Sequence, residues 1–159
     1  MSESHIGATL YISTTLPATN NAAGFEALTW VQVNGLIQEP QLGKTDAMID
    51  VPNQTTGFTT GVKGAGVGMD SQAQFEDVAS DAGQAALIAA AQSYPGKVAV
   101  KIGYGTGTDN ALETGDPVTY SQGVAHSYQR NQGNTTSYRG FQVGFRQNAT
   151  AVEATQPGV

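Results

Sequence analysis

The sequence contains no cysteine, only two histidines and few charged residues. Without cysteine, disulfide bonds and thiolate metal sites are excluded. His5 and His126 lie far apart and form no H-x-x-H pattern, so we expect neither a metal site nor a cofactor. Charged residues make up 13% of the chain, well below the usual share, which indicates a neutral polar surface. Such surfaces can be buried against copies of the same chain, because burying a charge costs far more.

The sequence also lacks long apolar runs. No stretch of 18 or more apolar residues is present, so we predict no membrane span. The first residues, MSESHIGATLYIS, carry neither a basic region nor an apolar core typical of a signal peptide, which favours synthesis in a cytoplasm. At 159 residues the chain fits a single domain, 1–159. We expect residues 1–24 to form a partly irregular arm and residues 148–159 a flexible tail.

Acidic residues outnumber basic ones, and the formal net charge is −6. This balance argues against a protein that grips duplex DNA, since neutralising phosphates requires Lys and Arg. The first 116 residues hold 12 acids and 4 bases, whereas residues 117–152 hold Arg130, Arg139, Arg146 and no acid. If the two parts lay on opposite surfaces, copies would attract each other head to tail. Scattered, solvated charges are the alternative interpretation.

The motifs of common catalytic sites are missing as well. A Ser/His/Asp site would need His126 with a serine and an acid, but no G-x-S-x-G elbow is present. Glu76 and Asp77 would point to opposite faces of a strand, which does not suit acid/base catalysis. The Gly-rich stretches 64–68 and 103–107 lack the spacing of nucleotide-binding loops. We therefore predict a protein that is not an enzyme, with His126 as a half-buried, hydrogen-bonded side chain.

Alternating apolar residues indicate a mainly β fold, a β-sandwich or split barrel. The expected strands are Ala8–Ser13, Phe25–Val33, Ala47–Val51 (ended by Pro52), Met69–Val78, Lys97–Tyr104, Val118–Gln129 and Tyr138–Gln147. The last strands are long and present small polar residues on one face. Their edges would stay open in a monomer, so we predict an assembly in which strands from several subunits close a barrel.

One stretch, 81–94, is predicted to form a short flanking helix. Asp81 and Gln84 have the spacing of a capping box, and Leu87, Ile88, Ala91 and Tyr94 form one apolar stripe. Pro95 and Gly96 would end the helix. About fourteen residues are too few for a stable isolated helix, so it should lie on the sheet.

A Gly-rich segment, 53–68, holds five glycines in sixteen residues. We expect it to be a long flexible loop or an extended hairpin. Loops of this length inside a compact domain usually have a function.

The layout resembles the major tail tube proteins of phages with long, non-contractile tails (siphophages). The resemblance rests on GATLYIS, FEALTWVQVNGL, TTGFTTGVKGAGVGMD, DAGQAALIAAAQ, KVAVKIGY and YRGFQVGFRQNATAV. It implies a β-sandwich or split barrel with one flanking helix. It further implies that copies form hexameric rings, that the rings stack into a tube, and that an extended loop and the termini bridge neighbouring rings.

The resemblance implies a structural virion protein, made in the host bacterial cytoplasm and located in the tail. The tube would hold the tape-measure protein and later pass genomic DNA without binding it specifically. Tail terminator and tail tip proteins would be further partners. Candidate lumen acids are Asp70, Glu76 and Asp77. Candidate inter-ring basic contacts are Arg130, Arg139 and Arg146. The candidate inter-ring loop carries Thr56, Phe58, Val62 and Lys63.

Two other functions stay open at the level of the sequence. A carbohydrate-binding or adhesive β-sandwich would use exposed Trp30, Tyr120, Tyr128 and Tyr138 as a sugar platform, although core packing explains these aromatics more simply. A small hydrolase is the other alternative, and it lacks a recognisable set of catalytic residues.

Overall fold

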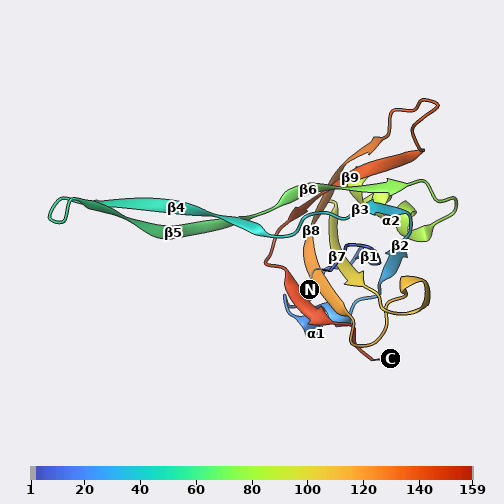
Figure 1. Ribbon diagram of the computed structural model, residues 1–159, viewed down its shortest axis with the longest axis horizontal. Helices are drawn as coiled ribbons and strands as arrows, with labels where there is room; N and C mark the ends of the chain where they lie inside the picture. Colours follow the sequence, from blue (N-terminus) through green and yellow to red (C-terminus); the bar gives the residue numbers. More distant parts are fainter. Residues whose placement is uncertain (1–2, 159) are drawn as a thin grey trace.

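The structure, a computed structural model, describes residues 3–158 and consists of a curled sheet from which one long hairpin projects (Figure 1). The ends of the expected arm and tail, residues 1–2 and 159, lie outside the described residues. The strands are β1 (Ala8–Ser13), β2 (Val31–Val33), β3 (Leu36–Gln38), β4 (Lys44–Asn53), β5 (Phe58–Gly68), β6 (Asp70–Glu76), β7 (Lys97–Tyr104), β8 (Pro117–Arg130), β9 (Gly140–Gln147) and β10 (Val152–Thr155). The helices are α1 (Ala22–Glu26), α2 (Ala82–Gln92) and the 3-10 turn η1 (Thr108–Asn110). None of the helices within 3–158 is long and apolar enough to cross a membrane.

The main sheet has eight strands in the order β2-β1-β7-β8-β9-β6-β3, with β10 paired to β8. Its two end strands, β2 and β3, follow each other in the sequence and are joined only by Asn34 and Gly35. The sheet therefore has to curl until its ends approach, which produces a split barrel. Gly35 makes this connection with φ +79, in a place where a Cβ atom would lie 2.6 Å from the carbonyl oxygen of Glu76. The predicted mainly β fold with one short flanking helix is confirmed.

Two apolar clusters lie on the two faces of the sheet. The larger cluster lies under α2 and includes Phe75 and Phe141, whose stacked rings are 5.1 Å apart. The smaller one joins Phe25 of α1 to Tyr120 of β8, with ring centroids 5.2 Å apart. Strand β7 lies between the two clusters and is buried on both faces. Lys101 on β7 is buried as well, because α1, Trp30 and β10 cover that side of the strand.

Helix α2 begins where the capping pattern predicts. The Asp81 side chain accepts a hydrogen bond from the Gln84 backbone N–H at 3.0 Å. The Gln84 side chain does not return to Asp81 as a capping box requires. Its carboxamide accepts from the Val78 N–H and donates to the carbonyl oxygens of Asn34 and Glu76, which joins the helix to the barrel. The predicted apolar stripe is correct for Leu87 and wrong for Tyr94, which follows the helix and is 99% exposed.

Both terminal regions are more ordered than expected. Strand β1 has the predicted bounds, but the expected strand 25–33 is wrong before Val31. Phe25 lies in α1 and Trp30 donates to its carbonyl oxygen, because both rings pack into the smaller apolar cluster. The expectation of a flexible tail is wrong for β10, which pairs with the first residues of β8. Its Val152 and Ala154 pack against the same cluster.

Candidate assembly interface

Residues 44–68 form the long hairpin that projects from the barrel (Figure 1). Of the two interpretations of the Gly-rich segment, a flexible loop and an extended hairpin, the structure shows the hairpin. Strand β4 is also longer than the expected 47–51 and runs through Pro52, which pairs with Thr59. Both strands of an isolated two-stranded ribbon are edge strands, where a proline is tolerated.

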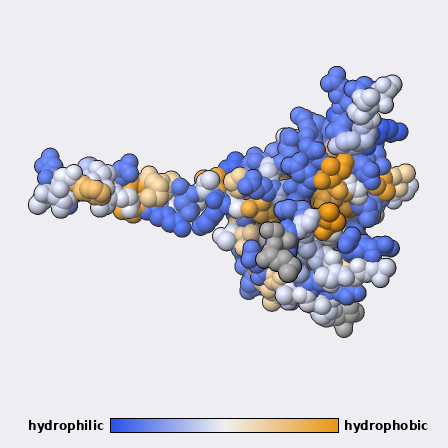
Figure 2. Space-filling view, in the orientation of Figure 1, coloured by the Kyte–Doolittle hydropathy of each residue, from blue (hydrophilic) through white to orange (hydrophobic). Residues whose placement is uncertain are grey.

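The hairpin has one exposed apolar face. Directly paired residues share a face of a sheet, and the pairs Ile49–Val62, Val51–Thr60 and Asn53–Phe58 follow each other along it. Phe58 is 73% exposed, and Ile49, Val51 and Val62 are each 44–54% exposed. We call Ile49, Val51, Phe58 and Val62 the hairpin face; Figure 2 shows apolar side chains along the projecting arm. An isolated two-stranded hairpin is marginally stable in water, and exposed apolar patches of this kind are typical of surfaces that contact other proteins.

The tip of the hairpin is an ordered turn rather than a flexible loop. The Asn53 side chain accepts hydrogen bonds from the N–H groups of Thr55 and Thr56 at 2.9 and 3.2 Å. Gly57 has φ +66 and donates its N–H to the Asn53 carbonyl oxygen. The Thr56 hydroxyl accepts from the Phe58 N–H at 3.3 Å. The turn therefore fixes where Phe58 is presented.

The root of the hairpin is fastened by polar contacts. Lys63 lies 3.1 Å and Lys44 3.5 Å from the Asp46 carboxylate. The hydrogen bond from Lys63, with help from Lys44, holds the pKa of Asp46 below its usual value. On the barrel side, the Gln147 side chain accepts from the Gly43 N–H at 2.8 Å and is almost fully buried. Sequence reasoning missed Gln147, since nothing in its neighbourhood marks it as different from the other glutamines.

A second surface, on the side of the sheet away from α2, is open and polar. Its residues alternate along β6 and β9 with the buried aromatics. They are Asp70, Gln72, Gln74, Glu76, His126, Gln142 and Arg146, and we call this set the open polar face. Three of its seven residues are glutamines, and the Gln142 side chain donates to the Gln129 carboxamide at 2.8 Å. The alternation of glutamine with buried apolar residues in QAQF and GFQV is the signal in the sequence that places these glutamines on one face.

The candidate lumen acids and the candidate basic contacts lie beside each other. Asp70 is paired in register with Arg146, and Asp77 lies 3.8 Å from Arg130 and 3.6 Å from Arg139. These arginines therefore do not form a surface opposite the acids, contrary to the head-to-tail charge pattern considered from the sequence. The reason is topological, because β6 carries the acids and pairs with β9.

His126 is half-buried and hydrogen-bonded, as predicted. Its Nε2 lies 2.8 Å from the Asp70 carboxylate and its Nδ1 2.8 Å from the Ser127 hydroxyl. The imidazole crosses strand β9 at Gly144, where a Cβ atom would lie 2.4 Å from the ring. Ser127, at φ 55, forms the bulge that shifts the register of β8. A serine, a histidine and an acid thus meet on the surface, and their contacts bridge three strands.

The aromatic residues do not form an exposed platform in the part of the chain that the structure describes. Tyr120 is buried between Phe25 and Trp30, and Tyr128 packs on Phe141. Only Tyr138 of the four candidates is exposed. Residues 3–158 also contain no group of three or more His, Cys, Asp or Glu that could hold a metal ion.

A comparison with solved structures links this architecture to a known assembly. A chain of the SPP1 tail tube, determined by solid-state NMR and cryo-EM, superposes with a TM-score of 0.59 and 9% sequence identity. The superposition covers 95% of this chain and 78% of the SPP1 chain. The chain shares the tail-tube fold. No known protein-family profile matches the sequence, and no curated protein does either.

The hairpin and the barrel each carry residues that the sequence analysis proposed as contacts between rings. Four residues proposed from the sequence for a bridging loop, Thr56, Phe58, Val62 and Lys63, all lie on the hairpin. Phe58 and Val62 belong to the hairpin face, Thr56 shapes the tip and Lys63 fastens the root. The loop residues thus lie on one projecting element, whereas the arginines lie on the barrel.

Proposed function

We propose that this protein is the structural subunit of a phage tail tube, in which copies form hexameric rings that stack into a hollow tube. The observation that carries the proposal is the hairpin face. Four large apolar side chains stand on a ribbon that the rest of the chain leaves uncovered. A ribbon of this kind is stabilised when it packs against another copy. The resemblance of the fold to the SPP1 tail tube supports the same arrangement.

The open polar face suits the wall of a channel. Glutamine carboxamides bind water and carboxylates repel phosphate, so DNA would slide past without being held. Asp70, Glu76 and Asp77 are our candidate lumen acids, and Gln72 and Gln142 join them on the strands that would line the channel. The tape-measure protein would occupy the channel first and genomic DNA would pass later. Tail terminator and tail tip proteins would close the two ends of the tube in the virion.

The proposal does not include catalysis. The contacts among Asp70, His126 and Ser127 hold neighbouring strands of the open polar face together. Both Asp70 and His126 are solvent accessible. In our proposal their contact fixes the bulge of β8 beside the channel. The protein would act through its shape and through contacts between copies.

The experiment compares two exposed valines changed to the same residue. Val62→Lys places a charge on the hairpin face, whereas Val78→Lys places it on a barrel loop with similar exposure. We expect V62K to remain monomeric and folded, as judged by light scattering and circular dichroism. We expect V78K to form tubes under the electron microscope. If V62K forms tubes as readily as V78K, the hairpin face is not an assembly surface.

A further inference from the structure

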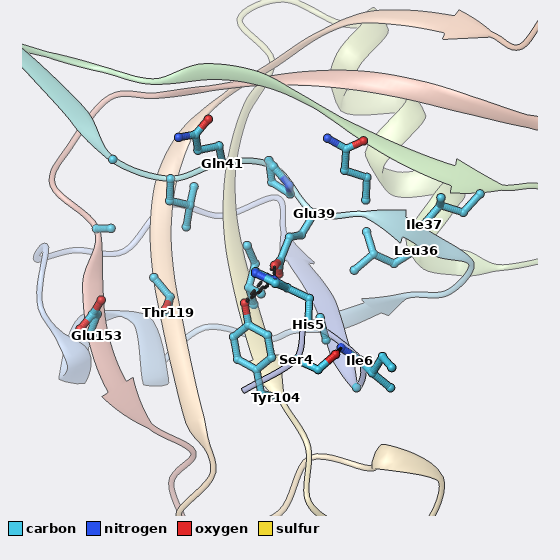
Figure 3. Close-up of a pocket in the computed structure, with 18 residues that line it drawn as sticks. Ser4, His5, Ile6, Leu36, Ile37, Glu39, Gln41, Tyr104, Thr119 and Glu153 are labelled. Atoms are coloured by element: carbon cyan, nitrogen blue, oxygen red, sulfur yellow. Dashed lines mark hydrogen bonds and ion pairs between the residues drawn. The ribbon is translucent and has the colours of Figure 1, made fainter. Parts of the chain in front are cut away.

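A large hollow lies at the mouth of the split barrel. Its volume is about 980 Å³, and its walls are the N-terminal residues 4–8 on one side and residues 36–43 on the other. Strands β7, β8 and β10 contribute Ile102, Tyr104, Thr119 and Glu153. Figure 3 shows Leu36, Ile37 and Ile6 along one side of this hollow and Glu39 at its centre. We call it the mouth groove.

The apolar rim of the mouth groove is exposed. Ile6 is 83% exposed and Ile37 is 49% exposed. The wall that carries Ile37 is strand β3, an end strand of the sheet that pairs only with β6. An end strand offers unpaired backbone N–H and C=O groups to an added strand. The groove thus presents apolar contacts and an open sheet edge together.

The lip of the groove is held in place by one partly buried carboxylate. Glu39 accepts hydrogen bonds from the Tyr104 hydroxyl at 2.9 and 3.1 Å, and His5 contacts the same carboxylate (Figure 3). Burial, together with Glu39, raises the pKa of Tyr104 to about 12, so the hydroxyl stays protonated and keeps donating. These contacts join the N-terminal segment to residues 36–43, so the two walls of the groove are held in a fixed position relative to each other.

We infer that the mouth groove is the receptor for the hairpin of a second copy of this chain. The inference rests on the proposed function and adds the surface on which the hairpin face is buried. The hairpin face is apolar and without charge, like the groove rim formed by Ile6, Leu36 and Ile37. The outer edges of the hairpin are unpaired, like the free edge of β3.

The dimensions and the connectivity agree with this assignment. Strand β4 has ten residues, and ten extended residues span about 33 Å. A globular body of this chain length is roughly 35 Å across, so the tip reaches the next copy along the stack. A hairpin on one surface and a groove on another form a heterologous contact, which repeats along a stack when the rotation between copies does not close a ring. Residues 40–43 line the groove and continue into β4, so groove and hairpin are parts of one segment.

Photo-crosslinking tests the inference directly. Benzoylphenylalanine replaces Phe58 in the full chain, the protein is irradiated under assembly conditions, and crosslinked peptides are mapped by mass spectrometry. We expect crosslinks between copies to residues 4–8 or 36–43. The same probe at Tyr138, which is also exposed, serves as the matched control and should not reach these residues. Crosslinks from position 58 that map elsewhere would overturn the inference.

A second variant separates the inference from the proposed function. Ile37→Lys places a charge on the groove rim, and we expect loss of tubes in I37K with the barrel folded, while V78K assembles normally. If V62K prevents tube formation but I37K assembles like the unmodified chain, the hairpin docks elsewhere, and only the groove assignment fails. If the unmodified protein forms neither rings nor tubes, the proposed function itself fails.

Discussion

The strands of the barrel and the strands of the hairpin differ in burial. In the barrel, β7 is buried on both faces by its own chain. In the hairpin, β5 exposes nearly every residue. Two phenylalanines make the contrast explicit, because Phe75 is fully buried and Phe58 is 73% exposed. The difference indicates that the barrel is stabilised within one chain, whereas in the proposed assembly the hairpin would be stabilised by contacts with another copy.

The largest expected effect is the difference in stability between alanine variants of these two phenylalanines. Phe75→Ala removes a ring stacked on Phe141 in the main cluster and should lower the free energy of unfolding by about 3–5 kcal/mol. Phe58→Ala should change the stability of the monomer by less than about 0.5 kcal/mol. Chemical denaturation of both variants below the assembly concentration measures the difference. Equal losses would show that the hairpin contributes to the fold of its own subunit.

A smaller effect is expected where α2 joins the barrel. Gln84→Ala removes a carboxamide with three backbone partners, and leaving buried backbone groups unpaired costs about 1–3 kcal/mol. Gln72→Ala on the open polar face serves as the control and should be close to neutral. If the two variants unfold at the same denaturant concentration, the Gln84 contacts do not stabilise the joint.

The barrel should also respond to alkaline pH through Lys101. Its amine is buried over the rings of Tyr11 and Trp30 and lies 3.3 Å from the Gln156 carboxamide. Burial lowers the pKa of Lys101. The charged form therefore destabilises the fold at neutral pH, and this cost disappears as the pH rises from the lowered pKa through the unfolded value of about 10.5. Relative to Lys101→Met, the unmodified protein should gain stability across that window. Parallel stability curves for the two proteins would contradict the assignment.

The smallest effect on the monomer is expected from the three arginines. Reversing Arg130, Arg139 and Arg146 to glutamate breaks the exposed ion pairs that Arg130 and Arg139 form with Asp77, and such pairs contribute at most about 1 kcal/mol. If the arginines also contact neighbouring rings, the triple variant should stack poorly, and added salt should weaken stacking of the unmodified protein. Tube formation that is unchanged in the variant would remove them from the interface.

The same contrast explains what the sequence could and could not reveal. Strands β1 and β7 and the Asp81 cap follow from local alternation and capping chemistry, and their predicted positions are correct. Helix α1 and strand β10 have weak local signals and depend on packing around Tyr120. The bulge at Ser127 moves Tyr128 to the face of the larger cluster, which a strict two-residue period cannot show. The hairpin is one of two interpretations of segment 53–68, because its glycines and threonines do not separate a flexible loop from an extended hairpin.

Cryo-electron microscopy of the purified, unmodified protein at increasing concentration tests the central claim most directly. We predict hollow tubes of stacked hexameric rings, in which the hairpin face is buried against a neighbouring copy and Gln72 and Gln142 face the channel. A protein that stays monomeric at high concentration would contradict the account. Tubes in which Phe58 and Val62 remain exposed to solvent would contradict it equally.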